Sequence, residues 1–100
     1  MKATDIKFVS PLDDLNPEND SIDVHVRLDD GRLFSFDVAT PNNIFFSMAN
    51  EGIDYYFGVP TVFVRLLNKE CVEKAIQAIL TEDGGRWLDV YGTLQSSGDD

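Results

Sequence analysis

A histidine, a serine and two aspartates lie on two neighbouring strand segments, and these residue types can form a nucleophilic triad. His25 is the only histidine in the chain. In the hairpin predicted below it faces Ser35, with Asp23 and Asp37 on the same side. A triad needs a nucleophile, a base and an orienting group within hydrogen-bond reach, but alternation alone places polar residues together on any solvent-facing strand surface. We therefore favour a polar outer face, and an enzymatic or ligand-binding cleft near His25 and Ser35 is the alternative.

The acidic loop at residues 11–21 is the next place where chemistry could occur. Side-chain oxygens recur there at every second residue, as in calcium-binding loops: Asp14, Asn16, Glu18 and Asp20. Pro17 interrupts this spacing, and the twelfth residue counted from Asp14 is His25 rather than the glutamate that an EF-hand requires. A solvated loop is the better interpretation, and we predict no metal and no cofactor.

A single cysteine, Cys71, excludes an internal disulfide and a zinc site with several thiolates. It falls in the first turn of a predicted helix, where the helix dipole favours a reactive thiolate. A lone, partly buried cysteine is more commonly a small apolar side chain.

The glycine pair Gly84 and Gly85 is not a phosphate-binding loop, because it closes a predicted helix instead of opening one. The sequence therefore predicts a protein that is not an enzyme.

The charge of the chain limits the class of partner. Eighteen acidic residues face eight basic ones, and the formal net charge is −10. Such a surface repels phosphate backbones and anionic lipid, which argues against nucleic-acid and membrane partners. It attracts a basic protein and speeds the encounter. The sequence has no apolar run long enough for a signal peptide or a membrane span, so a cytoplasmic location is expected.

Strict alternation predicts a hairpin over residues 22–38. Apolar residues recur at every second position on both strands, and Asp29, Asp30 and Gly31 lie between them. A three-residue loop puts the apolar residues opposite one another, whereas a two-residue loop mixes the faces. The three-residue register gives these pairs: Ile22 with Val38, Val24 with Phe36 and Val26 with Phe34. Gly31 then supplies the left-handed residue of the turn.

Two helices follow from capping residues and helical spacing. Thr40 and Pro41 are typical of a helix start, and Gly52 is typical of a helix end. The apolar stripe of this first helix consists of Ile44, Phe45, Met48 and Ala49. Asn68 caps a second helix, and the apolar run of residues 61–67 before it predicts a central strand.

These elements predict an α+β fold with the order β-β-β-α-β-α-β. A small, mostly antiparallel sheet would carry both helices packed on one of its faces. One hundred residues suffice for one hydrophobic core. We expect a single globular domain over residues 1–95, followed by a disordered tail at residues 96–100.

Three consecutive aromatic residues, Tyr55, Tyr56 and Phe57, suggest a binding surface. On an extended chain their directions alternate, so Tyr56 should point outward while Tyr55 and Phe57 point inward.

The leading hypothesis for the function is a small acidic module that binds a basic protein. An immunity or antitoxin-type inhibitor of a nuclease-like partner is one example of that class. A homodimeric structural or regulatory subunit is a further alternative. The predicted partner-binding residues are Asp13, Asp14, Glu18, Asp20 and Tyr56.

Overall fold

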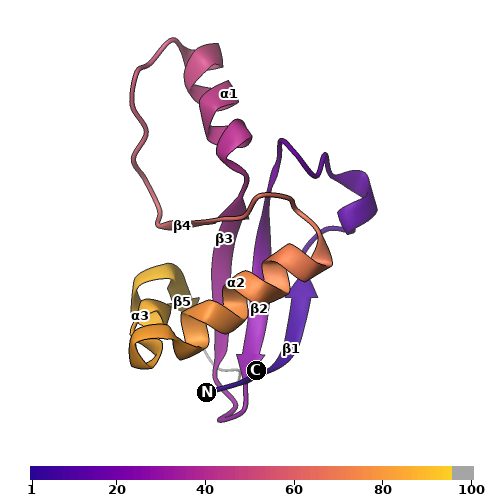
Figure 1. Ribbon diagram of the computed structural model, residues 1–100, viewed down its shortest axis with the longest axis vertical. Helices are drawn as coiled ribbons and strands as arrows, with labels where there is room; N and C mark the ends of the chain where they lie inside the picture. The colour runs from indigo at the N-terminus through magenta and orange to yellow at the C-terminus, as the bar shows by residue number, and fades with distance from the viewer. Residues whose placement is uncertain (96–100) are drawn as a thin grey trace.

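The structure is a computed structural model that describes residues 1–95, and the predicted disordered tail at 96–100 lies outside these residues. The predicted α+β class is confirmed: a five-stranded, mostly antiparallel sheet carries two main helices in the order β-β-β-α-β-α-β. The molecule is elongated, with principal extents of 43 × 27 × 27 Å (Figure 1). No helix within residues 1–95 is long and apolar enough to cross a lipid bilayer.

Three antiparallel strands form the main part of the sheet, and two short strands complete it. The long strands are β1 (Ala3–Phe8), β2 (Ser21–Leu28) and β3 (Leu33–Ala39). The short strands β4 (Thr61–Phe63) and β5 (Gly92–Leu94) both pair with β3. β4 runs parallel to the last residues of β3, and β5 runs antiparallel to its first residues.

The prediction of a central strand over residues 61–67 was wrong. β4 ends at Phe63 and pairs only with β3, so within the described residues it lies at the edge of the sheet. The apolar residues of the run 61–67 lie in different environments. Val62, Val64 and Leu67 enter the core, whereas half of the Phe63 side chain is exposed. A continuous apolar run therefore marked a short edge strand and the loop that follows it.

The predicted hairpin register is confirmed. Ile22 pairs with Val38, Val24 with Phe36 and Val26 with Phe34. The Leu28 N–H donates to the Arg32 carbonyl oxygen at 2.9 Å, which closes a three-residue loop. Gly31 has a φ of +91°, a conformation that favours glycine. Alternation thus sends one apolar set to a single face of the sheet.

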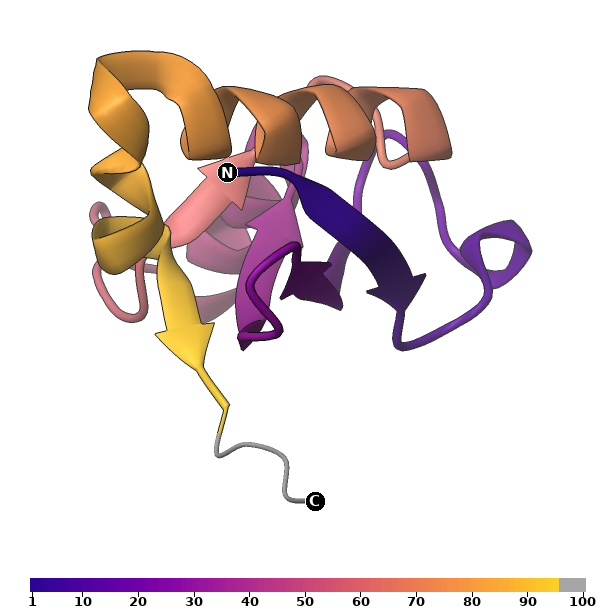
Figure 2. The same cartoon turned by 90° about the horizontal axis from the view of Figure 1, so that it is seen from below.

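The helix α2 (Lys69–Thr81) covers that apolar face, as Figures 1 and 2 show. Its side chains at helical spacing, which include Val72, Ile76 and Leu80, are buried against the strands. Asn68 caps the helix as predicted, because its Oδ1 accepts a hydrogen bond from the Cys71 N–H at 2.8 Å. The core therefore lies between α2 and the sheet.

The helix α1 (Pro41–Glu51) begins and ends as predicted but packs differently from the expectation. The Thr40 hydroxyl accepts a hydrogen bond from the Asn43 N–H at 3.4 Å, and Gly52 is left-handed with a φ of +69°. The expectation placed this helix on the same face as α2. Instead α1 extends beyond the end of the sheet, and none of its residues is buried (Figure 1). Since α2 already fills the apolar face, the stripe of α1 has no core to enter.

A tight corner connects α2 to the last strand. A 3₁₀ turn (Glu82–Gly85) leads to the short helix α3 (Trp87–Tyr91) and then directly to β5. Asp83, Gly84 and Gly85 are three consecutive left-handed residues. A Cβ atom at Gly85 would lie 2.6 Å from Met1 Cε and 3.0 Å from the Leu80 carbonyl oxygen. The corner therefore requires glycine at position 85 for both its backbone conformation and its close contacts.

Candidate functional site

The most distinctive surface of the molecule is an exposed aromatic arm. We use the term arm for α1, the segment 52–60 that follows it, and Phe63 of β4. Six of the eleven aromatic residues of the chain lie in the arm, with 45% to 84% of each exposed. They are Phe45, Phe46, Tyr55, Tyr56, Phe57 and Phe63. Single exposed apolar side chains are ordinary, but six exposed aromatic residues in one part of a small protein are unusual, and large exposed apolar patches are typical of interaction sites.

The predicted orientation of the three consecutive aromatics was wrong. All three are exposed, and Tyr56 at 45% is the least exposed, compared with 62% for Tyr55 and 84% for Phe57. The prediction assumed a strand against a sheet, but residues 53–60 pair with no strand, so no buried side exists for alternation to select. Tyr55 and Phe57 stack on each other instead, with ring centroids 6.0 Å apart and planes within 6°.

Tyr56 owes its lower exposure to a local contact. Its ring folds over Gly58, where an added Cβ atom would lie 3.5 Å from the Tyr56 hydroxyl oxygen. The core does not cover it. The structure therefore leaves Tyr56 on the surface, where a binding role remains a prediction, and adds Tyr55 and Phe57 to the accessible aromatics.

An apolar groove runs along α1. It has a volume of about 330 Å³ and is lined by five residues, none of them charged: Pro41, Ile44, Phe45, Met48 and Phe63. Three of these belong to the predicted apolar stripe of the helix. The stripe thus exists, but it faces an open groove instead of the sheet. The apolar spacing of α1 predicted these side chains but not the groove, because the same spacing on α2 faces a core.

The acidic loop lies beside the start of the arm (Figure 1). Asp13 and Asp14 are exposed in a short 3₁₀ turn (Leu12–Asp14). Glu18 is also exposed, and its carbonyl oxygen accepts a hydrogen bond from Asn42 Nδ2 at 3.2 Å. That bond ties the loop to the first turn of α1. Glu18 and Phe63 also line the same shallow hollow, so acidic and aromatic residues share one end of the molecule.

Asp20 has a structural role in this loop. Its two carboxylate oxygens accept hydrogen bonds from the backbone N–H groups of Asn16 at 3.1 Å and Ser21 at 2.9 Å. Its own N–H donates to the Thr40 hydroxyl at 3.4 Å, which is the same hydroxyl that caps α1. Asp20 and Thr40 therefore hold the loop and the helix start together. Of the four predicted acidic residues, Asp13, Asp14 and Glu18 present the more exposed carboxylates.

Acidic residues outnumber basic ones at this end of the molecule. Residues 8–24 and 41–60 contain seven acidic residues and no lysine or arginine. Two of the acids, Glu51 and Asp54, lie on the arm itself. Arg65 is the basic residue that lines the nearby hollow. This end therefore combines aromatic groups with a net negative charge.

The residues of the alternative catalytic site lie on the open face of the sheet. His25 is directly opposite Ser35, and Asp23 is opposite Asp37, as the register predicted. The Asp37 carboxylate accepts a hydrogen bond from the Thr61 hydroxyl at 2.8 Å and so belongs to the β3–β4 junction. Within residues 1–95, no side-chain hydrogen bond joins His25 to Ser35. Nor does any group of three or more His, Cys, Asp and Glu residues there have a geometry that could hold a metal ion.

The acidic turn of the hairpin is accounted for by the backbone. The Asp30 carboxylate accepts hydrogen bonds from the Arg32 N–H at 3.0 Å and from Arg32 Nε at 2.7 Å. The backbone hydrogen bond is the largest cause that lowers the pKa of Asp30 below its ordinary value of 3.8, and the guanidinium adds to it. These contacts close a surface turn, so the Asp30 carboxylate has a local structural role.

Comparison with protein-family models, with curated proteins and with solved structures found no match to this chain. The surface of the protein is therefore the basis for a functional assignment. Its two distinctive features are the aromatic arm and the acidic loop that hydrogen-bonds to it.

Proposed function

We propose that this protein is a small, non-enzymatic binding module that uses its aromatic arm and acidic loop to dock a basic protein. The observation that carries the proposal is the exposure of six aromatic side chains on an arm without a buried residue in its helix. Aromatic residues are favoured anchors at protein interfaces, where they fill pockets on the partner.

The size of the aromatic surface supports a protein partner. Each of these side chains has a surface of about 200 Å², and at the observed exposures the six present on the order of 700 Å². One partner of a standard protein interface contributes about 800 Å². Folding leaves this apolar area in contact with water, so covering it would contribute favourably to association.

The charge distribution supports a basic partner over a second copy of the chain. The arm and the neighbouring loop carry acidic residues without lysine or arginine, as described above. Two copies that met through this end would bring like charges together, which opposes association. A partner with lysine and arginine around an apolar patch would meet opposite charge at the rim and apolar surface at the centre.

An immunity or antitoxin-type inhibitor of a nuclease-like protein is one class with this chemistry. A nuclease binds phosphates with basic residues, and an acidic inhibitor can occupy their positions. A cytoplasmic setting is part of the proposal, because the single thiol of Cys71 cannot form an internal disulfide and needs no oxidising compartment.

The proposal is tested by affinity capture from the native host with paired variants of the tagged protein. Phe57→Ser removes an arm aromatic, and we expect it to weaken capture by roughly thirtyfold, the effect of an anchor worth about 2 kcal/mol. Lys74→Ser is its control, since this exposed residue lies on α2. Partners that both variants retain equally would not be partners of the arm.

A second pair of variants tests the charge argument. The loop variant combines Asp13→Asn, Asp14→Asn and Glu18→Gln. Its control makes the same change in net charge elsewhere, with Asp5→Asn, Asp29→Asn and Asp89→Asn. With the purified partner, the loop variant should slow association and reduce its salt dependence more than the control does, because exposed charges are screened within about 8 Å at physiological ionic strength. Equal effects of the two variants would show that only net charge matters and would contradict docking at this end.

A further inference from the structure

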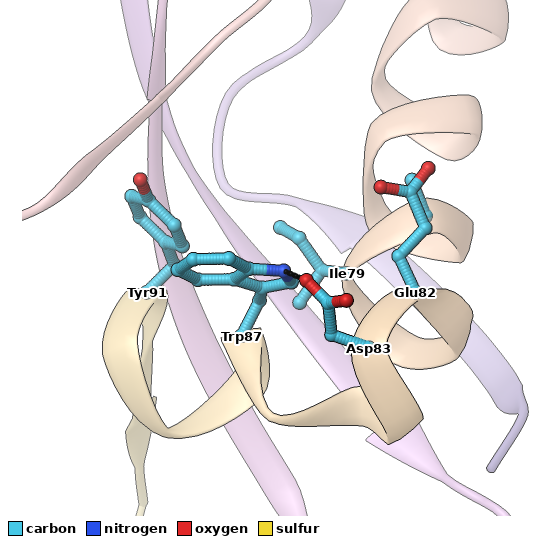
Figure 3. A pocket seen from close by; sticks show the side chains of 6 residues that line it. Ile79, Glu82, Asp83, Trp87 and Tyr91 are labelled. Atoms are coloured by element: carbon cyan, nitrogen blue, oxygen red, sulfur yellow. Dashed lines mark hydrogen bonds between the residues drawn. The ribbon is translucent and has the colours of Figure 1, made fainter.

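A second hollow lies at the corner between α2 and α3, in the half of the molecule away from α1 (Figures 1 and 3). It has a volume of about 350 Å³. Its lining combines aromatic, aliphatic and acidic side chains: Ala78, Ile79, Glu82, Asp83, Trp87 and Tyr91. No basic residue lines it, and it shares no residue with the arm or the acidic loop. The corner pocket is therefore independent of the proposed docking end.

Trp87 forms the floor of this pocket, and a hydrogen bond fixes its ring. The indole Nε1 donates to Asp83 Oδ2 at 2.8 Å (Figure 3). Asp83 has a left-handed backbone with a φ of 52°, which aims its carboxylate back at the indole. A carboxylate that accepts a hydrogen bond from the indole N–H also makes the ring more electron-rich. The ring thereby becomes a better partner for a cation at its face.

The remaining residues surround that face. The Tyr91 ring lies beside Trp87, with ring centroids 6.3 Å apart and planes inclined by 43°. Glu82 projects on the opposite side of the hollow, and Ile79 closes the back (Figure 3). The Arg86 guanidinium lies 5.0 Å from the centre of the Trp87 ring but does not line the pocket. The indole thus already engages one cation, and it also lines the pocket, which Arg86 does not.

We infer that the corner pocket binds an alkylated ammonium group, such as a trimethylammonium head. The two aromatic faces attract the positive charge, the carboxylate of Glu82 balances it, and the aliphatic wall accepts the methyl groups. A bare ammonium would suit the pocket less well. It is strongly hydrated, and its N–H donors would meet the apolar wall of Ala78 and Ile79. The chemistry at this site is recognition without covalent change.

The only tryptophan of the chain is in the pocket, so intrinsic fluorescence reports on it directly. The probe is choline, and the control ligand is 3,3-dimethylbutanol, which has the same shape without the charge. We expect choline to give a saturable change in Trp87 emission and to bind about tenfold more tightly than the alcohol, which corresponds to about 1.4 kcal/mol. Equal responses to the two ligands, or no saturable response to choline while the protein stays folded, would overturn the inference.

Variants then test the roles of the individual side chains. Tyr91→Leu keeps an apolar group but removes an aromatic face, and Glu82→Gln keeps the shape but removes a charge. We expect each to weaken choline binding by roughly three- to tenfold. Asp89→Asn removes an exposed charge from α3 outside the pocket, and it should change binding by less than about twofold. If Asp89→Asn weakened binding as much as Glu82→Gln, attraction to the general negative charge would explain the result and the pocket would not.

The source of the ammonium group is distinguished by a third ligand. An N-acetylated, C-amidated trimethyllysine offers the same head group on a peptide backbone. Tighter binding than that of choline would identify a methylated lysine of another protein as the natural occupant, and equal or weaker binding would identify a small molecule. Because the arm variant Phe57→Ser leaves the pocket intact, its failure to bind a protein partner would not affect any of these ligand titrations.

Discussion

Truncation of Phe57 separates a binding role from a folding role. The side chain is 84% exposed, so folding removes only about one-sixth of its surface from water. Complete burial of a phenylalanine contributes about 1.5–3 kcal/mol, and the corresponding share for Phe57 is about 0.2–0.5 kcal/mol. Its stack with Tyr55 lies in solvent, so we take the lower end of the range for aromatic pairs, about 0.5 kcal/mol. We therefore expect Phe57→Ala to lower the free energy of unfolding by less than about 1 kcal/mol.

The matched substitution is Phe36→Ala in the core. Phe36 is 1% exposed and packs between the sheet and α2. Removal of a buried phenylalanine ring costs about 3–5 kcal/mol. In a domain of this size, each 1 kcal/mol lowers the melting temperature by about 4–8 °C. Thermal unfolding followed by circular dichroism should therefore show a shift of a few degrees for Phe57→Ala and of more than about 12 °C for Phe36→Ala.

A shift for Phe57→Ala as large as that for Phe36→Ala would refute this reasoning, because the side chain would then be buried in solution. The measurement at two protein concentrations identifies the cause. A loss of stability that appears only at the higher concentration would mean that the arm is covered by a second copy. A loss that is independent of concentration would mean that the arm folds back on its own domain.

Four further predictions concern the turns and caps. Gly31→Val should destabilise the protein by about 1–3 kcal/mol in urea unfolding, since a β-branched residue resists a φ of +91°. Asp30→Asn should be nearly neutral, and a loss of function without unfolding in that variant would point to a site in the turn. Arg32→Ala should raise the pKa of Asp30 only part of the way to 3.8 in an NMR titration, because the backbone N–H donor remains. In the wild type the pKa of Asp30 is lowered, so the associated stabilisation is present above about pH 3.8 and is lost as the pH falls through the folded-state pKa. Thr40→Ala should cost about 1–2 kcal/mol, since the buried hydroxyl accepts hydrogen bonds from both Asn43 and Asp20. Gly85→Ala should destabilise more than Gly52→Ala by the same measurement, because only at position 85 would the new Cβ atom clash.

The hairpin and the helix caps could be predicted from the sequence because they depend on local rules. Alternation over residues 22–38 admits one register that keeps the apolar residues on one face, and the structure has that register. Thr40, Gly52 and Asn68 act on backbone groups within a few residues of themselves. No knowledge of distant segments is needed for either kind of prediction.

The environment of the arm could not be predicted in this way. The apolar stripe of α1 shows that one side of the helix is apolar, but it does not specify what covers that side. The stripe of α2 has the same spacing and faces the sheet, whereas the stripe of α1 faces an open groove. Alternation also failed for Tyr56, because it assigns an inward and an outward direction only where a sheet lies beside the chain. The corner pocket depends on three left-handed residues, of which Asp83 gave no sequence signal.

The central claim is that the arm binds a basic protein, and site-specific cross-linking in the native host tests it most directly. A photoreactive benzoylphenylalanine replaces Phe57 in one protein and Lys74, on α2, in the control. We predict that position 57 cross-links to a peptide of another protein that is rich in lysine and arginine, that added salt diminishes this cross-link, and that position 74 does not form it. Cross-links from position 57 only to the same chain, or to the same proteins as from position 74, would contradict the claim.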